Sequence, residues 1–156
     1  MSNLFRGITE ISVDQKGRIA IPTRFREQIK QRSSGEMVIT LDPRTCKCLL
    51  IYLTPDFDES QREVEKLPNI DDPVAHQLQQ VFIGCAQDVE MDQQGRVLVP
   101  AALRKLVELD KTATLVGQST KFELWPQEVW DARVNAWKEN GLGGEGKEGV
   151  LSGLSI

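Results

Sequence analysis

The stretch VDQKGRIAIPTRFR, residues 13–26, decides the fold, because the chain repeats it as MDQQGRVLVPAALR at residues 91–104. At an offset of 78 residues the two copies share six identical positions, with apolar residues matched between them. The identical pairs are Asp14 and Asp92, Gln15 and Gln93, Gly17 and Gly95, Arg18 and Arg96, Pro22 and Pro100, and Arg26 and Arg104. Such a repeat is one supersecondary unit used twice, so we expect two halves that pack as a pseudo-symmetric pair.

Each copy has the pattern of a strand, a tight loop, a second strand and a helix. The first loop contains Gly17, which can adopt a positive φ at a tight turn. Ile19 and Ile21 then share one face of the return strand. Pro22 ends that strand and suits the first turn of a helix, which we expect at about 23–32.

Two further strands follow each short helix, in the pattern of a hairpin. We expect strands at 37–41 and 48–53 around a turn at 42–45, and at 113–116 and 121–125 around a turn at 117–120. Between the two copies, the sequence Asp71-Asp72-Pro73 predicts the start of a helix. One face of that helix is expected to carry the apolar residues Val74, Leu78, Val81, Phe82 and Cys85.

These elements indicate a mainly β chain with helices, an α+β fold. We expect one module at 5–57, a helical connector at 58–82, a second module at 83–130, and a C-terminal helix with a flexible tail at 131–156. The tail contains six glycines after Asn140, and this composition predicts mobility.

Composition argues against several classes of protein. A chain of 156 residues with 40% hydrophobic residues can fill a packed core, yet no apolar run is long enough to cross a bilayer. The first residues lack the hydrophobic core of a signal peptide. Three cysteines and one histidine favour neither a disulfide framework nor a zinc site. We therefore expect a soluble cytoplasmic protein with reduced thiols, no metal and no cofactor.

Charge is distributed unevenly along the chain, whose net charge is −4. Residues 13–32 carry six basic and two acidic side chains, a net charge of +4, whereas residues 91–111 carry only +1. Residues 56–72 carry −5, which fits a solvated helix face. The repeated motifs are thus the basic parts of an acidic protein, and one basic face is compatible with an anionic partner.

The phrases DQKGR at 14–18 and DQQGR at 92–96, each leading to a proline, resemble the MraZ family, whose chains contain two SpoVT/AbrB-type modules. Phe5-Arg6-Gly7 before the first module and FELW at 122–125 in the second are similar to that family too. The resemblance covers about residues 4–138.

This resemblance implies a fold, an activity and an assembly. The implied fold is a tandem swapped-hairpin AbrB-like β-barrel with a pseudo-twofold repeat and flanking helices. The implied activity is that of a DNA-binding transcriptional regulator, typically a repressor of the division and cell-wall gene cluster that includes its own gene, associated with the nucleoid. The implied assembly is a homo-oligomeric ring.

Two roles for the motif arginines remain open and are compatible. Asp14 and Arg18 can pair across the loop and fix its shape, as can Asp92 and Arg96. Alternatively, each aspartate orients an arginine whose planar fork binds phosphate or guanine. A pre-oriented arginine loses less conformational freedom when it binds DNA.

Other basic residues have supporting roles in this hypothesis. Lys16 and Arg24 are expected to contact phosphates, and Arg6 is a further candidate. Gln94 replaces the lysine in the second copy, so this contact is not expected there. Arg26 and Arg104 are candidates for intersubunit or intramodule partners instead. Because a ring presents many copies of a weakly basic loop, we expect it to bind tandem direct repeats of double-stranded DNA, not a palindrome.

Two rival functions come from other classes. Asp14 and Asp92 could meet as the acid–base pair of an enzyme, although the sequence offers no nucleophile motif, phosphate-binding glycine loop or metal cluster beside them. A MazE-type antitoxin would bind a protein through its tail, yet this tail has few apolar anchors. We therefore expect a regulator, not an enzyme.

Overall fold

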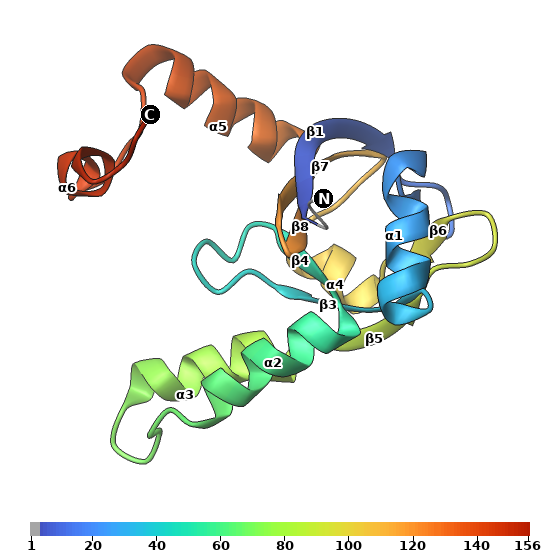
Figure 1. The fold of residues 1–156 in the computed structure, drawn as a ribbon, viewed down its shortest axis with the longest axis horizontal. Helices are drawn as coiled ribbons and strands as arrows, with labels where there is room; N and C mark the ends of the chain where they lie inside the picture. The colour runs from blue at the N-terminus through green and yellow to red at the C-terminus, as the bar shows by residue number, and fades with distance from the viewer. Residues whose placement is uncertain (1–3) are drawn as a thin grey trace.

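Two antiparallel sheets organise residues 4–156, the part of the chain that the computed structural model describes (Figure 1). The larger sheet has the strand order β1 (Phe5–Ser12), β7 (Thr112–Ser119), β8 (Lys121–Pro126), β4 (Leu49–Leu53), β3 (Glu36–Leu41) and β5 (Gln87–Glu90). The smaller sheet pairs β2 (Arg18–Ala20) with β6 (Arg96–Leu98). With its helices, the chain has a mixed α+β fold, as the sequence pattern predicts.

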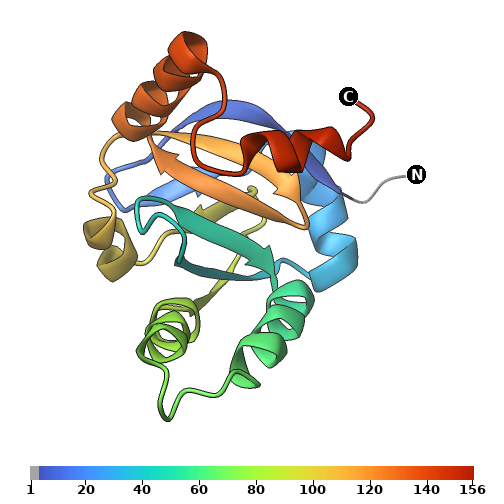
Figure 2. The same ribbon diagram turned by 90° about the vertical axis from the view of Figure 1, so that its left-hand side faces the viewer.

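The strands of the two modules are interleaved, not segregated. Strand β1 of the first module pairs with β7 of the second, and β5 of the second pairs with β3 of the first. The hairpins β3–β4 and β7–β8 join through β4 and β8 at the centre of the sheet. Within the described residues the ladder ends at β1 and β5 and does not close into a barrel. Figure 2 shows the orange strands of the second module beside the teal strands of the first.

Helices surround the sheet on several sides (Figures 1 and 2). They are α1 (Thr23–Ser33), α2 (Thr54–Glu65), α3 (Pro73–Gln79), the π-helix η1 (Gln80–Gly84), α4 (Ala101–Leu106), α5 (Gln127–Asn140) and α6 (Lys147–Ser152). The predicted helix at 23–32 is confirmed. The Asp72 cap is confirmed too, since its carboxylate accepts hydrogen bonds from the amides of Val74 and Ala75. None of the helices in the described part of the chain has the length and apolar character needed to span a membrane.

The main hydrophobic core draws on both modules. Ile19 and Ile21 from the first copy of the motif are buried with Val97 and Val99 from the second. Its aromatic part also crosses the boundary between modules: Phe122 of β8 stacks on Phe5 at a centroid distance of 4.2 Å. Because the core is shared, the modules are parts of one folding unit.

Three local predictions differ from the structure. The turn expected at 117–120 is shorter, because Gln118 pairs with Lys121 and Ser119 takes a left-handed φ of 68°. Val74 lies in the first helical turn and is 73% exposed, so it does not continue the buried stripe. The tail contains the short helix α6, which its glycine content did not predict.

Candidate nucleic-acid interface

The first motif loop is built around the carboxylate of Asp14. Its Oδ1 accepts hydrogen bonds from the amides of Lys16 at 2.9 Å and Arg18 at 2.8 Å. Its Oδ2 accepts a hydrogen bond from Arg18 Nε at 2.8 Å. Gly17 completes the turn with a φ of 90° and donates its amide to the Asp14 carbonyl. One side chain therefore sets both the backbone of the loop and the direction of its arginine.

The second loop repeats this geometry. Asp92 Oδ1 accepts from the amides of Gln94 and Arg96, both at 2.9 Å, and Oδ2 accepts from Arg96 Nε at 3.3 Å. Gly95 has a φ of 80°. The longer bond to Arg96 Nε, together with the missing lysine, makes the second loop similar but not equivalent.

Hydrogen bonds from the loop keep both aspartates ionised. The amide of Arg18 is the largest factor that lowers the pKa of Asp14, and the amide of Arg96 does the same for Asp92. Both carboxylates are therefore negative at neutral pH and orient a cation. The predicted Asp–Arg pairs are present in both loops. Each pair uses the arginine Nε, not the two terminal amino groups that make a bidentate contact with a base.

Strands β2 and β6 place the two motif arginines on one outer face. Ile19 and Val97 lie opposite each other and point into the core, so their neighbours point outward. Arg18 lies opposite Leu98, and Arg96 lies opposite Ala20. We call these four outward residues, Arg18, Ala20, Arg96 and Leu98, the ribbon face. The arginines are diagonal neighbours, which corresponds to a separation of about 7–8 Å between their backbones.

The loops flank this ribbon face at opposite ends. Because β2 and β6 are antiparallel, the loop that precedes each strand lies at a different end of the ribbon. Both loops are on the right-hand side of Figure 1, next to α1. Asp14 and Asp92 are thus separated by the ribbon, and each is bonded to its own loop. This arrangement gives no support to a shared acid–base site.

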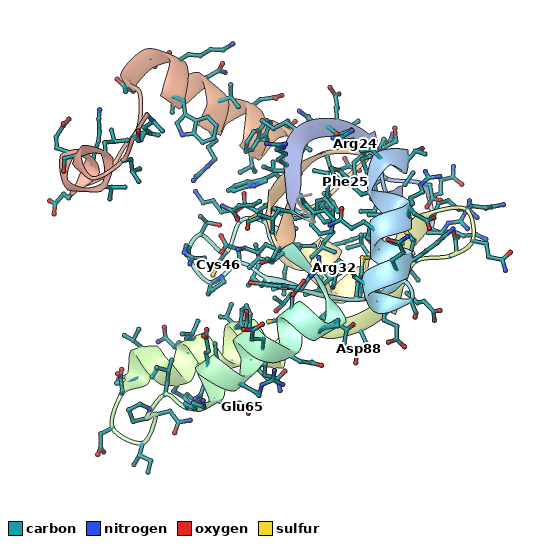
Figure 3. The ribbon with its side chains drawn as sticks, viewed as in Figure 1. Arg24, Phe25, Arg32, Cys46, Glu65 and Asp88 are labelled. Carbon is teal, nitrogen blue, oxygen red and sulfur yellow. The ribbon has the colours of Figure 1, made fainter. Side chains whose placement is uncertain are left out.

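Arg24 and Arg6 lie away from the ribbon face. Arg24 donates to Thr9 Oγ1 at 3.0 Å and its guanidinium lies 4.4 Å from the Phe25 ring centre, against β1 (Figure 3). Arg6 is about 20 Å along β1 from the end of that strand at Ser12. Lys16, by contrast, lies in the first loop itself and is exposed. The phosphate contacts proposed for Arg24 and Arg6 would therefore extend the surface along β1.

Arg26 and Arg104 each make a hydrogen bond within their own module. Arg26 Nε donates to the carbonyl of Ile21 at 2.7 Å, and Arg104 Nε donates to the carbonyl of Val99 at 2.9 Å. Both arginines are half-buried. The intramodule role expected from the sequence is therefore present, and the intersubunit role stays a prediction.

Leu98 is a residue that sequence reasoning missed. It is 51% exposed and lies opposite Arg18 on the ribbon face. The alternation of Arg96, Val97 and Leu98 holds the signal, since an inward Val97 requires an outward Leu98. Thymine methyl groups are apolar partners in the major groove, so an exposed leucine between arginines suits a DNA surface.

Comparisons with known proteins place the chain in a family. A family model described as "MraZ protein, putative antitoxin-like" matches residues 4–79 and 82–145. A protein of Hydrogenovibrio crunogenus is 45% identical over 152 residues, which cover 97% of this chain and 98% of that protein. Proteins of Methylococcus capsulatus and Halorhodospira halophila are 42% identical over 136 residues and 37% identical over 154 residues. These matches cover 87% and 98% of this chain, and 88% and 100% of those proteins. All three relatives are named "Transcriptional regulator MraZ".

Proposed function

The chain belongs to the MraZ family, and we propose that it is a transcriptional regulator that binds double-stranded DNA through the ribbon face and its two loops. The observation that carries this proposal is the presence of Arg18 and Arg96 on one exposed face, each oriented by an ionised aspartate.

The dimensions of the ribbon suit the DNA major groove. A groove about 12 Å wide admits a two-stranded β-ribbon, and outward arginines on the ribbon can reach guanine edges with their terminal amino groups. Lys16 at one end supplies a cation for a phosphate. The acidic helix α2 projects away from the loops in Figure 1, together with its neighbour α3, so the negative charge of α2 is kept from this surface.

We propose further that the protein acts as a ring on tandem direct repeats. One chain offers a small ribbon with two arginines, which limits its affinity for a single site. In a ring, once one subunit has bound DNA, the contacts of the other subunits are effectively intramolecular. The overall affinity of the ring for DNA then exceeds that of one subunit. The proposed target is the promoter of the division and cell-wall gene cluster that includes its own gene, where the ring would act as a cytoplasmic, nucleoid-associated repressor. The exchange of β1 and β5 between modules supports a swapped-hairpin arrangement within each subunit.

Arg18→Ala tests the DNA-binding surface. We expect it to cost about 1–3 kcal/mol of binding free energy, the range for a bidentate arginine–guanine contact. The measurement is fluorescence anisotropy with a duplex from upstream of the protein's own gene. Arg62→Ala in the acidic helix α2 removes the same charge far from the ribbon and should leave affinity unchanged. Full affinity in the Arg18→Ala variant, with the assembly intact, would refute the proposed surface.

Changed repeat spacing tests the ring. Repeats separated by about one helical turn place equivalent grooves on the same side of the duplex. We expect insertion of half a turn between repeats to weaken binding strongly, while each repeat alone keeps its weak affinity. Sedimentation of the protein–DNA complex would report the number of chains. Equal affinity for natural and altered spacing would contradict the ring.

The family model, described as antitoxin-like, ends its match at residue 145, and a second candidate function is protein binding by the tail that follows. Residues Val150, Leu154 and Ile156 are exposed there. Removal of residues 141–156 should abolish such binding but leave DNA affinity unchanged. Loss of DNA affinity in this truncation would link the tail to the regulator function instead.

A further inference from the structure

We propose that Arg104 and Arg26 are positioning residues for DNA binding, and that each fixes the motif loop of the other module. This inference rests on the proposed function. Arg104 belongs to α4 of the second module, yet its guanidinium covers Gly17 in the first loop. Arg26 belongs to α1 of the first module and covers Gly95 in the second loop. A Cβ added to either glycine would overlap the arginine above it.

Hydrogen bonds also connect each loop to the arginine that covers its glycine. The amide of Val99 donates to the carbonyl of Gly17 at 3.0 Å, and the carbonyl of Val99 accepts from Arg104 Nε at 2.9 Å. The Arg104 guanidinium then returns to Gly17. The first loop is therefore connected to itself through two residues of the second module, Val99 and Arg104.

The second loop is connected in the same way. The amide of Ile21 donates to the carbonyl of Gly95 at 2.8 Å, and the carbonyl of Ile21 accepts from Arg26 Nε at 2.7 Å. Two independent copies of one arrangement, with the modules exchanged, indicate a feature of the fold and not a chance contact of one side chain.

Each loop is thus held from two sides. Its own aspartate binds it from within, and an arginine from the other module packs on its glycine. Gly17 and Gly95 are both buried although they lie in surface loops, because these arginines cover them. A loop that is fixed before binding loses less entropy when DNA arrives, and this difference appears as affinity.

The two positioning residues should have unequal weight. The first loop carries Lys16 and the shorter aspartate–arginine bond, so it contributes more to the proposed surface. Arg104 supports that loop. The residue with the larger effect on DNA affinity therefore belongs to the less basic second module.

A double-mutant cycle tests the crossed pattern. Arg104→Lys and Arg26→Lys retain the charge but lose the planar fork, so they separate positioning from simple attraction. Each would be combined with Arg18→Ala and with Arg96→Ala, and affinity measured by anisotropy on the duplex from upstream of the protein's own gene. We expect Arg104→Lys alone to weaken binding about tenfold, within the range for interacting residues. It should add little to Arg18→Ala yet combine additively with Arg96→Ala, and Arg26→Lys should show the reverse.

Hydrogen exchange on the protein without DNA provides an independent readout. Arg104→Lys should speed exchange at the amides of Gly17 and Arg18, which bond to Asp14, and leave those of Gly95 and Arg96 unchanged. Arg26→Lys should do the opposite. Additive energies in all four combinations, or faster exchange in the loop of the variant's own module, would overturn the inference. If Arg18→Ala itself left DNA affinity unchanged, the proposed function would fail, while the exchange pattern would still decide whether the positioning crosses between modules.

Discussion

At the residue scale, each motif loop depends on one aspartate carboxylate and on one glycine, which has no side chain. Asp14 accepts three hydrogen bonds from within its loop, and Gly17 leaves the space that Arg104 fills. The glycine has two reasons to be there, since its φ of 90° also disfavours any residue with a Cβ. A loop of this kind tolerates few substitutions although it lies at the surface.

Gly17→Ala should be destabilising for both reasons. We expect a loss of about 1–3 kcal/mol in the free energy of unfolding, measured by urea denaturation. Gly84→Ala is the matched control, because a Cβ at Gly84 would meet no atom within 4 Å and Gly84 lies in a helical segment. That change should be neutral or stabilise by about 0.4–1 kcal/mol. Equal effects of the two substitutions would show that Arg104 and the positive φ do not constrain the loop.

At the element scale, a buried hydroxyl of the sheet helps to anchor the π-helix η1. Thr40 on β3 is fully buried, and its Oγ1 donates to the Phe82 carbonyl at 2.8 Å and lies 3.2 Å from the Val81 carbonyl. The last four carbonyls of a helix have no partner within the helix, so a donor from the sheet satisfies this end. Phe82 packs beside it on Phe57 at a centroid distance of 5.0 Å, which joins η1 to α2.

Thr40→Val should loosen η1 selectively. Valine preserves the shape but removes the donor, and an unsatisfied buried carbonyl costs about 1–3 kcal/mol. Hydrogen exchange should become faster at the amides of η1 and α3, with the strand amides of β7 unaffected. Thr112→Val, at an exposed strand position, is the control. Unchanged exchange in η1 would mean that packing of Phe82 alone holds this helix.

Local signals in the sequence predict the elements well but not their partners. Pro22 and Asp72 mark helix starts correctly, because capping and proline geometry act within a few residues. Alternation also gives the inward positions of Ile19 and Val97. It cannot tell whether β1 pairs with a strand of its own module or with β7, since either pairing buries the same face.

In the candidate site, too, the sequence predicts only contacts between residues that lie close together along the chain. The bonds of Asp14 to Arg18 span four residues and follow from the motif itself. The contact of Arg24 with Thr9 spans 15 residues, and that of Arg104 with Gly17 joins different modules. These contacts depend on how distant segments pack, which no local pattern encodes.

At the scale of the whole molecule, two nearly symmetric halves present unequal charge. The amide of Gln94 bonds to Asp92 as the amide of Lys16 bonds to Asp14, so the two side chains occupy equivalent backbone positions. Only the first is a cation. The two copies are therefore alike in the backbone that forms the ribbon, but they differ at the position where a side chain would bind phosphate.

Gln94→Lys should make the second loop resemble the first. We expect tighter DNA binding and a steeper salt dependence, with the slope of log K against log salt changing by about 1 for one added phosphate contact. Anisotropy titrations at several salt concentrations measure both quantities. Gln77→Lys on α3 adds the same charge away from the ribbon and serves as the control. An identical gain from both variants would show that net charge, not loop position, governs binding.

The pairing of β1 with β7 also sets an order in time. Residues Phe5–Ser12 leave the ribosome long before Thr112–Ser119 are synthesised, and at about 5–20 residues per second the interval of about 100 residues lasts about 5–20 s. Throughout that interval the nascent N-terminal strand has no partner, and unpaired strands are prone to join strands of neighbouring chains. Two chains translated side by side on one messenger would therefore each carry an unpaired first strand at the same time. During synthesis, pairing of β1 with β7 of its own chain therefore competes with pairing of β1 with a strand of a neighbouring chain.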